Sequence, residues 1–296
     1  MSSSKPDPKR RFPLPLTQVR GQAGGRVQEA GATRPVPRTD LQRPQRTVHV
    51  AAADAARQRA PVGLGLDSAA VRARMVERLR AAGITEPHVL AAFAAVERHR
   101  FVDSALVNQA YEDTSLPIGF GQTISKPSVV GQMLQALLEG RPMPARRPVR
   151  SDAGDSDTAP VLRQVLEIGT GCGYQAAVLA RLAERVVSIE RVGALAEKAR
   201  ANLAACGVHN VQVRHADGRL GAPDLGPFDA IVSAAGGDDL PEAWLAQLAV
   251  GGRLVAPGAE VRPGAQALLV VDRHAAGCAR RSAGDVYFVP LKFGAE

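Results

Sequence analysis

Cysteine is scarce in this sequence, which contains only Cys172, Cys206 and Cys278, separated by long stretches of chain. An odd number of cysteines at such spacing excludes a disulfide framework and matches no zinc-binding pattern. The six histidines also lack the spacing of metal ligands, so we expect no metal site. Scattered cysteines are typical of a reducing compartment, and we therefore expect a cytoplasmic protein.

Long apolar runs and a secretory leader are missing as well. No stretch approaches the roughly 18 apolar residues that cross a bilayer. The N-terminal run MSSSKPDPKRRFPLPL lacks the apolar core of a signal peptide. An arginine-rich organelle transit peptide stays open as an alternative, although the prolines oppose the amphipathic helix it needs. The sequence thus predicts a soluble protein.

Acidic residues are few in the N-terminal part of the chain. Residues 1–60 hold 12 Lys/Arg against 4 Asp/Glu, a balance of +8, so residues 61–296 hold 25 of each and are neutral. A basic tail can contact nucleic acid or anionic lipid weakly, but Phe12 is its only aromatic residue, which does not support base stacking. We therefore expect no nucleic-acid partner beyond weak contact by this tail.

The tail and the domain differ in composition. Residues 1–66 are rich in Pro, Gly, Gln and Arg and cannot bury enough apolar surface to order themselves, so we expect a disordered tail followed by a domain at 67–296. Within the domain, residues 140–160 carry many helix breakers and no periodicity, which predicts an exposed insertion loop. We expect a monomer.

Three helices are predicted before this loop. The first follows an N-cap at Asp67-Ser68, carries apolar residues at helical spacing and ends at Gly83; the others span 87–99 and 127–139. The apolar positions of the first helix are Val71, Met75 and Leu79.

From Val161 onward, strand-like and helix-like segments alternate. This alternation predicts βαβ units and a doubly wound, mainly parallel α/β sheet with helices on both faces. Near the end, ALLVVDRH and VYFVPL have no clear helix between them, which predicts an antiparallel edge. The preceding helices would form an N-terminal helical cap.

The segment LEIGTGCGYQAA, residues 166–177, joins a predicted strand to a predicted helix. Its glycines, Gly169, Gly171 and Gly173, permit a tight turn and let a ligand approach the backbone near the positive end of the helix. The same string also fits a dinucleotide fingerprint, and a turn that serves packing alone is a further alternative.

Acidic residues at three strand ends favour S-adenosylmethionine over NAD. Glu167 precedes the glycines and suits a cationic ligand with an amino group, whereas Glu190 ends the next strand and can accept ribose hydroxyls. Asp217-Gly218 ends the third strand, where it either approaches an adenine edge or forms a plain turn. A carboxylate that accepts hydrogen bonds from ribose hydroxyls, as expected for Glu190, also occurs in NAD sites.

Five motifs occur in the order found in one family: QTISKPSVVGQMLQALL (122–138), VLEIGTGCGYQAAVLA (165–180), HADGRLG (215–221), FDAIVSAA (228–235) and GGRLVAPG (251–258). Together with FVDSALVNQAYEDTSLPIG and the terminal YFVPL, they resemble protein-L-isoaspartate O-methyltransferases over about residues 70–292. The glycine loop is generic to class I methyltransferases, but LPIGFGQTIS points to this family.

The resemblance implies a Rossmann-like class I methyltransferase that uses S-adenosyl-L-methionine. The acceptor would be the free α-carboxyl of L-isoaspartyl residues in damaged proteins or peptides, whose methyl ester closes to a succinimide and partly returns to aspartate. The resemblance also implies that Ser125 is catalytic and that Tyr111 to Ser125 pass over the cofactor. The residues facing cofactor and substrate would be Gln122, Thr123, Ile124 and Ser125.

The residues alone allow another role for Ser125. Serine is a favoured helix N-cap, and a helix is predicted to start at Pro127. Lys126 either attracts the acceptor carboxylate or is an exposed lysine at the helix start, which we expect. Cys172 could have a lowered thiol pKa near the helix N-terminus, although we expect it to fill space. We expect Trp244 to pack in the core.

One departure from the family pattern concerns the loop after FDAIVSAA. Gly236-Gly237-Asp238-Asp239 follow, where proline or a similar residue is common. The sequence therefore does not fix the shape of the loop expected over the sulfur atom of the cofactor. Three other functions also stay open: methylation of another carboxyl or small molecule, nucleic-acid binding by the basic tail, and a nicotinamide oxidoreductase.

Overall fold

The computed structural model describes residues 69–140, 160–237, 239–262 and 265–296. The expected disordered tail and the N-cap at Asp67-Ser68 lie outside these residues, as does nearly all of the expected loop at 140–160. Within the described ranges, no helix combines the length and apolar composition that crossing a membrane requires.

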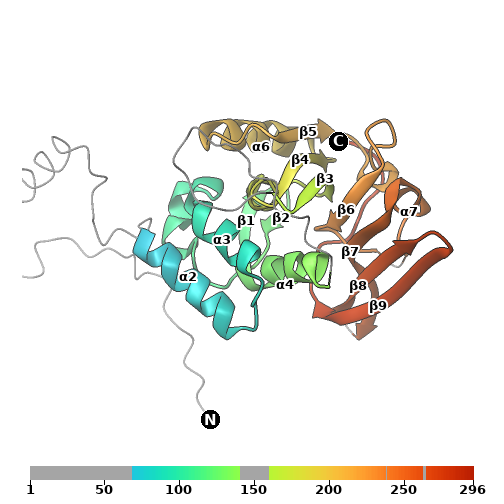
Figure 1. Cartoon of the computed structure of the whole chain (residues 1–296). Coiled ribbons are helices and arrows are strands. Elements are labelled where there is room, and N and C mark those ends of the chain that lie inside the picture. Colours follow the sequence, from blue (N-terminus) through green and yellow to red (C-terminus); the bar gives the residue numbers. More distant parts are fainter. Residues whose placement is uncertain (1–68, 141–159, 238, 263–264) are drawn as a thin grey trace, which may run out of the picture. The chain divides into compact units, whose positions relative to one another are not determined.

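A seven-stranded sheet forms the centre of the structure, in the order β5-β4-β3-β6-β7-β8-β9 (Figure 1). Neighbouring strands from β5 to β7 run parallel, whereas β8 pairs antiparallel with both β7 and β9. The predicted mainly parallel sheet with an antiparallel C-terminal edge is therefore confirmed. The strands are β3 (Leu162–Ile168), β4 (Ala183–Glu190), β5 (Val211–His215), β6 (Phe228–Ser233), β7 (Leu248–Arg262), β8 (Ala265–His274) and β9 (Gly277–Val286).

Helices cover the sheet and form a cap beside it. Figure 1 shows α2 and α3 next to α4, on the side of the short antiparallel hairpin of β1 (Leu116–Gly119) and β2 (Gln122–Ile124). The α-helices are α2 (Ala69–Ala81), α3 (Pro87–Ala95), α4 (Pro127–Leu138), α5 (Tyr174–Leu179), α6 (Gly193–Ala205) and α7 (Glu242–Gln247). The 3-10 helices are η2 (Arg98–Phe101), η3 (Ser104–Gln109) and η4 (Gly218–Leu220).

The two faces of the sheet bury separate apolar clusters. In β3, Val165 belongs to the larger cluster, which includes α4, whereas Leu166 and Ile168 belong to a second cluster with Trp244 of α7. Successive strand residues point to opposite faces, so the continuous apolar run of β3 requires cover on both sides. The doubly wound arrangement follows from this run, and Trp244 is a core residue as expected.

The apolar spacing located the first and third helices well. In α2, Met75 and Leu79 are buried and Gly83 follows the helix with a φ of 94°. α4 begins at Pro127 as predicted and ends one residue earlier than expected. The second predicted helix is shorter, because α3 ends at Ala95 and the 3-10 turn η2 follows.

The sequence placed the edge strand incorrectly. β9 consists of residues 277–286 and pairs with β8 directly after a tight turn, whereas VYFVPL lies almost wholly beyond it. The polar run GCARRSAGDV lacks a strand pattern because nine of its ten residues are not buried on this outermost strand. Pairing with β8 sets its conformation, and local hydrophobicity does not.

Candidate active site

A cavity lies at the carboxyl ends of β3, β4 and β6, with an empty volume of about 880 Å³. From β3 the chain continues to β4 and β5 on one side, and then to β6 and β7 on the other. Open α/β sheets bind ligands where the strand order reverses in this way. The wall combines the β1–β2 hairpin, the glycine loop, the strand ends and residues 289–292.

The glycine loop contributes backbone to this wall. Gly169 and Gly171 line the cavity, and a Cβ at Gly171, where φ is 55°, would lie 3.0 Å from Cδ1 of Ile118. Gly173 does not line the cavity. As the N-cap of α5 it packs against α6, where a Cβ would lie 3.3 Å from Cγ of Leu203. Gly173 thus has a packing role, and its ligand contact stays a prediction.

Glu190 lies in the wall as predicted. Its Oε2 accepts a 2.8 Å hydrogen bond from the backbone N–H of Gly171, and its Oε1 accepts a 2.9 Å bond from that of Val192. Each carboxylate oxygen has a further lone pair. The fixed carboxylate therefore keeps acceptor capacity for hydroxyl groups of a ligand.

Glu167 lies elsewhere than predicted. Its side chain is 0% exposed, does not line the cavity, and accepts a hydrogen bond from the Ser188 hydroxyl. Burial raises the pKa of Glu167 to about 8, helped by the negative charge of Glu190 and opposed by hydrogen bonding. The raised pKa favours the protonated form of this carboxyl near neutral pH. Glu167 thus lies outside the residues that line the cavity, and its contact with the cofactor stays a prediction.

Asp217 and Gly218 differ in their position relative to the cavity. Gly218 lines the cavity, and its carbonyl accepts a 2.8 Å hydrogen bond from Nε1 of Trp244. Asp217 does not line it: one carboxylate oxygen caps η4 at the N–H of Arg219, and the other accepts from the N–H of Gly294. Asp217 thus takes part in a turn, which was one of the two alternatives, and its adenine contact stays a prediction.

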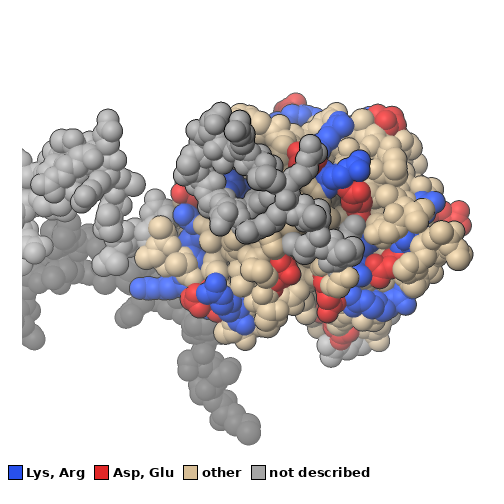
Figure 2. All heavy atoms as spheres, viewed as in Figure 1, with Lys and Arg blue, Asp and Glu red and all other residues tan. Residues whose placement is uncertain are grey.

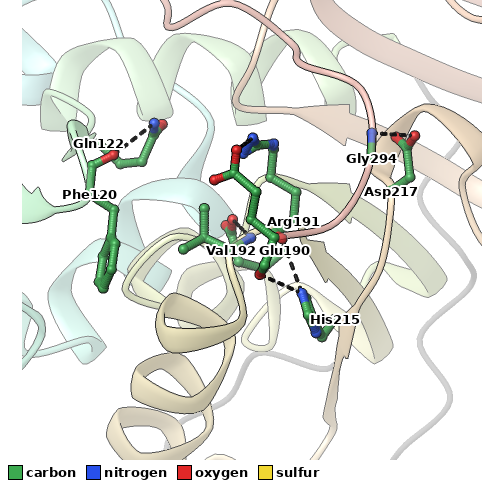
Figure 3. Close-up of polar contacts among 9 residues, drawn as sticks. Phe120, Gln122, Glu190, Arg191, Val192, His215, Asp217 and Gly294 are labelled. Atoms are coloured by element: carbon green, nitrogen blue, oxygen red, sulfur yellow. Dashed lines mark hydrogen bonds and ion pairs between the residues drawn. The ribbon is translucent and has the colours of Figure 1, made fainter.

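The β1–β2 hairpin brings Gln122, Thr123, Ile124 and Ser125 to the cavity, as predicted. At the hairpin tip, Phe120 has a φ of 54° and a side chain that is 64% exposed (Figure 3). Of the longer stretch expected over the cofactor, Tyr111 is buried in the core and bonded to His99. Only the part from Ile118 onward contributes to the wall.

Ser125 does not cap α4. The N-cap residue is Lys126, without a side-chain cap bond, so the capping alternative is wrong. Lys126 is exposed, as expected for a helix-start lysine.

Cys172 is buried in the cavity wall, and burial raises the pKa of its thiol, which agrees with a space-filling role. Among described residues, no group of three or more potential ligands could hold a metal ion.

Sequence reasoning missed Arg98, which lies beneath the site. Its fully buried guanidinium donates to the carbonyl oxygens of Ala110 at 2.7 Å, Thr114 at 3.4 Å and Ser125 at 2.8 Å. It also lies 4.7 Å from the ring centroid of Tyr174, and burial lowers its pKa. In the sequence, Arg98 stands within the charged run ERHR and has no distinguishing signal.

Comparison with known proteins agrees with this geometry. The sequence pattern of the protein-L-isoaspartate(D-aspartate) O-methyltransferase (PCMT) family matches residues 70–144 and 159–296. The chain belongs to this family. The gap in the match, residues 145–158, lies within the stretch predicted as an insertion loop.

Individual relatives cover nearly the whole chain. Protein-L-isoaspartate O-methyltransferases of Methylibium petroleiphilum and Leptothrix cholodnii are each 50% identical over 296 residues, which covers 100% and 99% of this chain and 99% and 98% of theirs. A solved structure of that name is 26% identical with a TM-score of 0.62, covering 75% of this chain and 67% of the other. A Plasmodium falciparum PCMT structure in complex with S-adenosyl-L-homocysteine shares the fold, with 24% identity, a TM-score of 0.60, and coverage of 74% and 97%.

The structure explains why glycine occupies position 236 of this PCMT chain. It forms two backbone hydrogen bonds with residues 289–291, and a side chain there would collide with Gln266 and Pro257. Glycine at this position therefore lets Gln266 and Pro257 pack closely against the backbone that pairs with residues 289–291.

Proposed function

We propose that this chain transfers the methyl group of S-adenosyl-L-methionine to the free α-carboxyl of L-isoaspartyl residues in damaged proteins or peptides, with Ser125 as the catalytic residue. The activity follows from membership of the family. The observation that carries the assignment of the site is that one cavity contains both Ser125 and the glycine loop with Glu190. The methyl ester formed starts repair through a succinimide.

The cavity suits a polar nucleoside cofactor. Gln175 lines it with a polar side chain, whose amide interacts with Glu167 without completing a well-formed hydrogen bond through Nε2. Glu190 would accept from the ribose hydroxyls, and backbone at Gly169, Gly171 and Gly218 would allow close approach. Bound there, S-adenosylmethionine supplies an electrophilic methyl group.

The residues of the chain then have to position the acceptor. A carboxyl with a pKa near 4 is ionised at neutral pH, so it needs no general base. Holding the acceptor in the reactive geometry can lower the barrier by about 7–11 kcal/mol. The Ser125 hydroxyl would donate a hydrogen bond to the carboxylate, while Arg98 holds the Ser125 carbonyl in place.

A pair of peptides tests the acceptor. Methyl-ester formation is measured with an isoaspartyl peptide and with its aspartyl twin, and we expect activity with the first only. Equal rates would defeat the isoaspartyl assignment and favour another carboxyl acceptor. Calorimetric titration is expected to detect binding of S-adenosylmethionine and none of NAD.

Ser125→Ala tests the catalytic residue. A hydrogen bond to a charged group contributes about 1.5–3 kcal/mol, so kcat/KM for the isoaspartyl peptide should fall about tenfold to a hundredfold. The dissociation constant of the cofactor should change little. Ser282→Ala on the exposed edge strand β9 is the matched control. A Ser125→Ala enzyme with undiminished kcat/KM would exclude the proposed role.

The remaining proposals concern the setting of the protein. We propose that the protein is a monomer and that it is located in the cytoplasm. The cytoplasmic location agrees with the three free cysteines, Cys172, Cys206 and Cys278. Light scattering coupled to size-exclusion chromatography tests the first point, and cell fractionation tests the second.

A further inference from the structure

The last described residues, Val289–Glu296, form what we call the closing segment. Val289, Pro290, Leu291 and Lys292 line the cavity, although they lie about a hundred residues beyond Glu190 in the sequence. The C-terminal end lies beside β5 in Figure 1, so the segment runs along the edge of the sheet where the strands end. This segment is joined to the rest of the domain at two places.

The first anchor is made by backbone alone. The N–H of Gly236 donates to the carbonyl of Val289 at 3.0 Å, and the N–H of Leu291 donates to the carbonyl of Gly236 at 2.6 Å. Gly236 is buried, so water competes little for these bonds. This end of the segment is firmly held.

The second anchor begins at Gly294. Its N–H donates to Oδ2 of Asp217 at 2.8 Å, and Phe293 packs its ring 4.0 Å from the guanidinium of Arg219. Figure 3 shows Gly294 and Asp217 facing each other, with Arg191 and His215 nearby. Asp217, predicted as a cofactor residue, thus holds the closing segment.

Glu296 completes the second anchor. Its N–H donates to the carbonyl of Arg191 at 2.6 Å, and its main-chain oxygen accepts from the N–H of Gly193 at 2.8 Å and from Nε2 of His215 at 2.9 Å. Its carboxylate pairs with the guanidinium of Arg191. Arg191 itself lines the cavity and follows Glu190 directly, so Glu296 is coupled to the cofactor wall.

The two anchors differ in strength. The Glu296 side chain is 67% exposed and that of Arg191 is 18% exposed, so solvent and salt screen their attraction. Exposed ion pairs contribute little to stability. The hydrogen bonds of the second anchor are more numerous, but they are made by exposed residues, Gly294 and Glu296, whereas Gly236 is buried. Water therefore competes more strongly at the second anchor, which is the end that opens more readily, while Gly236 keeps the other end in place.

We propose that the closing segment is the gate for cofactor exchange, and that Glu296 is a positioning residue that holds it shut through Arg191. This inference depends on the assignment of the cavity to S-adenosylmethionine proposed above. Every turnover must release S-adenosylhomocysteine and admit new cofactor, and such release steps often depend on the opening of a loop. Ser125 belongs to the hairpin side of the wall, so we expect the acceptor to reach it there without passing this gate.

The test measures the dissociation rate of S-adenosylhomocysteine from the full-length protein by a chase with excess unlabelled ligand. Glu296→Gln should speed dissociation about two- to fivefold, as expected for loss of an exposed pair. Adding Phe293→Ala should bring the total to about tenfold. The KM for the cofactor should rise, and the KM for the isoaspartyl peptide should stay constant.

Glu184→Gln is the matched control, because it removes the same charge at the amino end of β4, whereas Arg191 follows the carboxyl end of that strand. Raising the salt concentration should speed dissociation from the wild type and from Glu184→Gln, but hardly from Glu296→Gln. Thermal unfolding of each variant checks that the fold is intact.

The outcomes separate this inference from the proposed function. If the wild type fails to bind S-adenosylhomocysteine, the assignment of the cavity is wrong. If the wild type binds but the double variant releases ligand at the wild-type rate, the assignment of the cavity is retained and the proposed gate is rejected. Hydrogen exchange gives an independent readout: the amides of Gly294 and Glu296 should exchange faster than that of Leu291, and the reverse order contradicts opening at Glu296.

Discussion

Glu167 and Glu190 lie on adjacent strands of the sheet, yet their surroundings give them opposite properties. Glu190 is held by two backbone N–H groups at the cavity. Glu167 is fully enclosed, and its Oε1 completes no well-formed hydrogen bond among the described residues, although Gln175 interacts with this carboxyl. Desolvation disfavours the charged form, so the pKa of Glu167 rises from 4.5 to about 8.

The raised pKa of Glu167 predicts a pH dependence of stability. Between pH 4.5 and 8 the folded protein keeps the Glu167 proton that the unfolded chain has released, so the free energy of unfolding falls as the pH rises through this range. The stabilising contribution is complete below pH 4.5 and is lost by about pH 8. A tenfold difference in proton affinity between the folded and unfolded states corresponds to about 1.4 kcal/mol.

Glu167→Gln is expected to flatten this decline. Urea unfolding at pH 5 to 9 measures the slope, and Glu184→Gln, which removes an exposed carboxylate, should retain the decline of the wild type. A Glu167→Gln protein with an unchanged slope would show that another group titrates.

At the level of elements, Arg98 joins parts of the helical cap to the β1–β2 hairpin. One planar guanidinium bonds to carbonyls at the end of η3, before β1 and after β2. Its Nη1 and the Tyr174 hydroxyl lie close enough to interact electrostatically, but neither atom completes a well-formed hydrogen bond among the described residues. A lysine keeps the charge but lacks the fork that reaches several acceptors at once.

We therefore expect Arg98→Lys to lower the free energy of unfolding by about 1–3 kcal/mol, because buried carbonyls lose their donor. kcat for the isoaspartyl peptide should fall as well, since the Ser125 backbone is no longer fixed. Urea unfolding and steady-state kinetics measure the two effects. Arg74→Lys on the exposed side of α2 should leave both unchanged. Full stability of Arg98→Lys would contradict the proposed link.

At the scale of the whole molecule, charge is unevenly distributed along the chain. The net charge of +8 belongs to residues 1–60, and in the described part Figure 2 shows acidic and basic side chains interspersed on the visible face. All the residues assigned to the cavity lie between 118 and 292. We therefore expect methyl transfer to be independent of the basic residues at the start of the chain.

Removal of residues 1–66 should leave methyl transfer and the melting temperature unchanged, because the described residues already form two buried apolar clusters. The truncated protein should elute from heparin at low salt, since the basic residues have been removed. Salt-resistant binding of nucleic acid by the truncated protein would revive the nucleic-acid alternative. Chromatography and a melting curve of both forms provide the comparison.

The sequence by itself determined the parts that depend on local pattern. Alternating strand and helix segments predicted the sheet, and the glycines after β3 predicted where a ligand meets backbone. Glu190 and the QTIS segment were identified from their positions and from the family resemblance. Signals of this kind survive without tertiary contacts because they reflect periodicity, backbone freedom or motif order.

Only the tertiary structure decided the roles that depend on burial and on contacts between distant residues. Enclosure makes Glu167 a neutral structural carboxyl, and a fully buried position makes Arg98 a support for Ser125. Glu296 meets Arg191 across 105 positions of sequence. The physical reason is that the energy of a charge depends on its solvent exposure and on its partners, and folding fixes both.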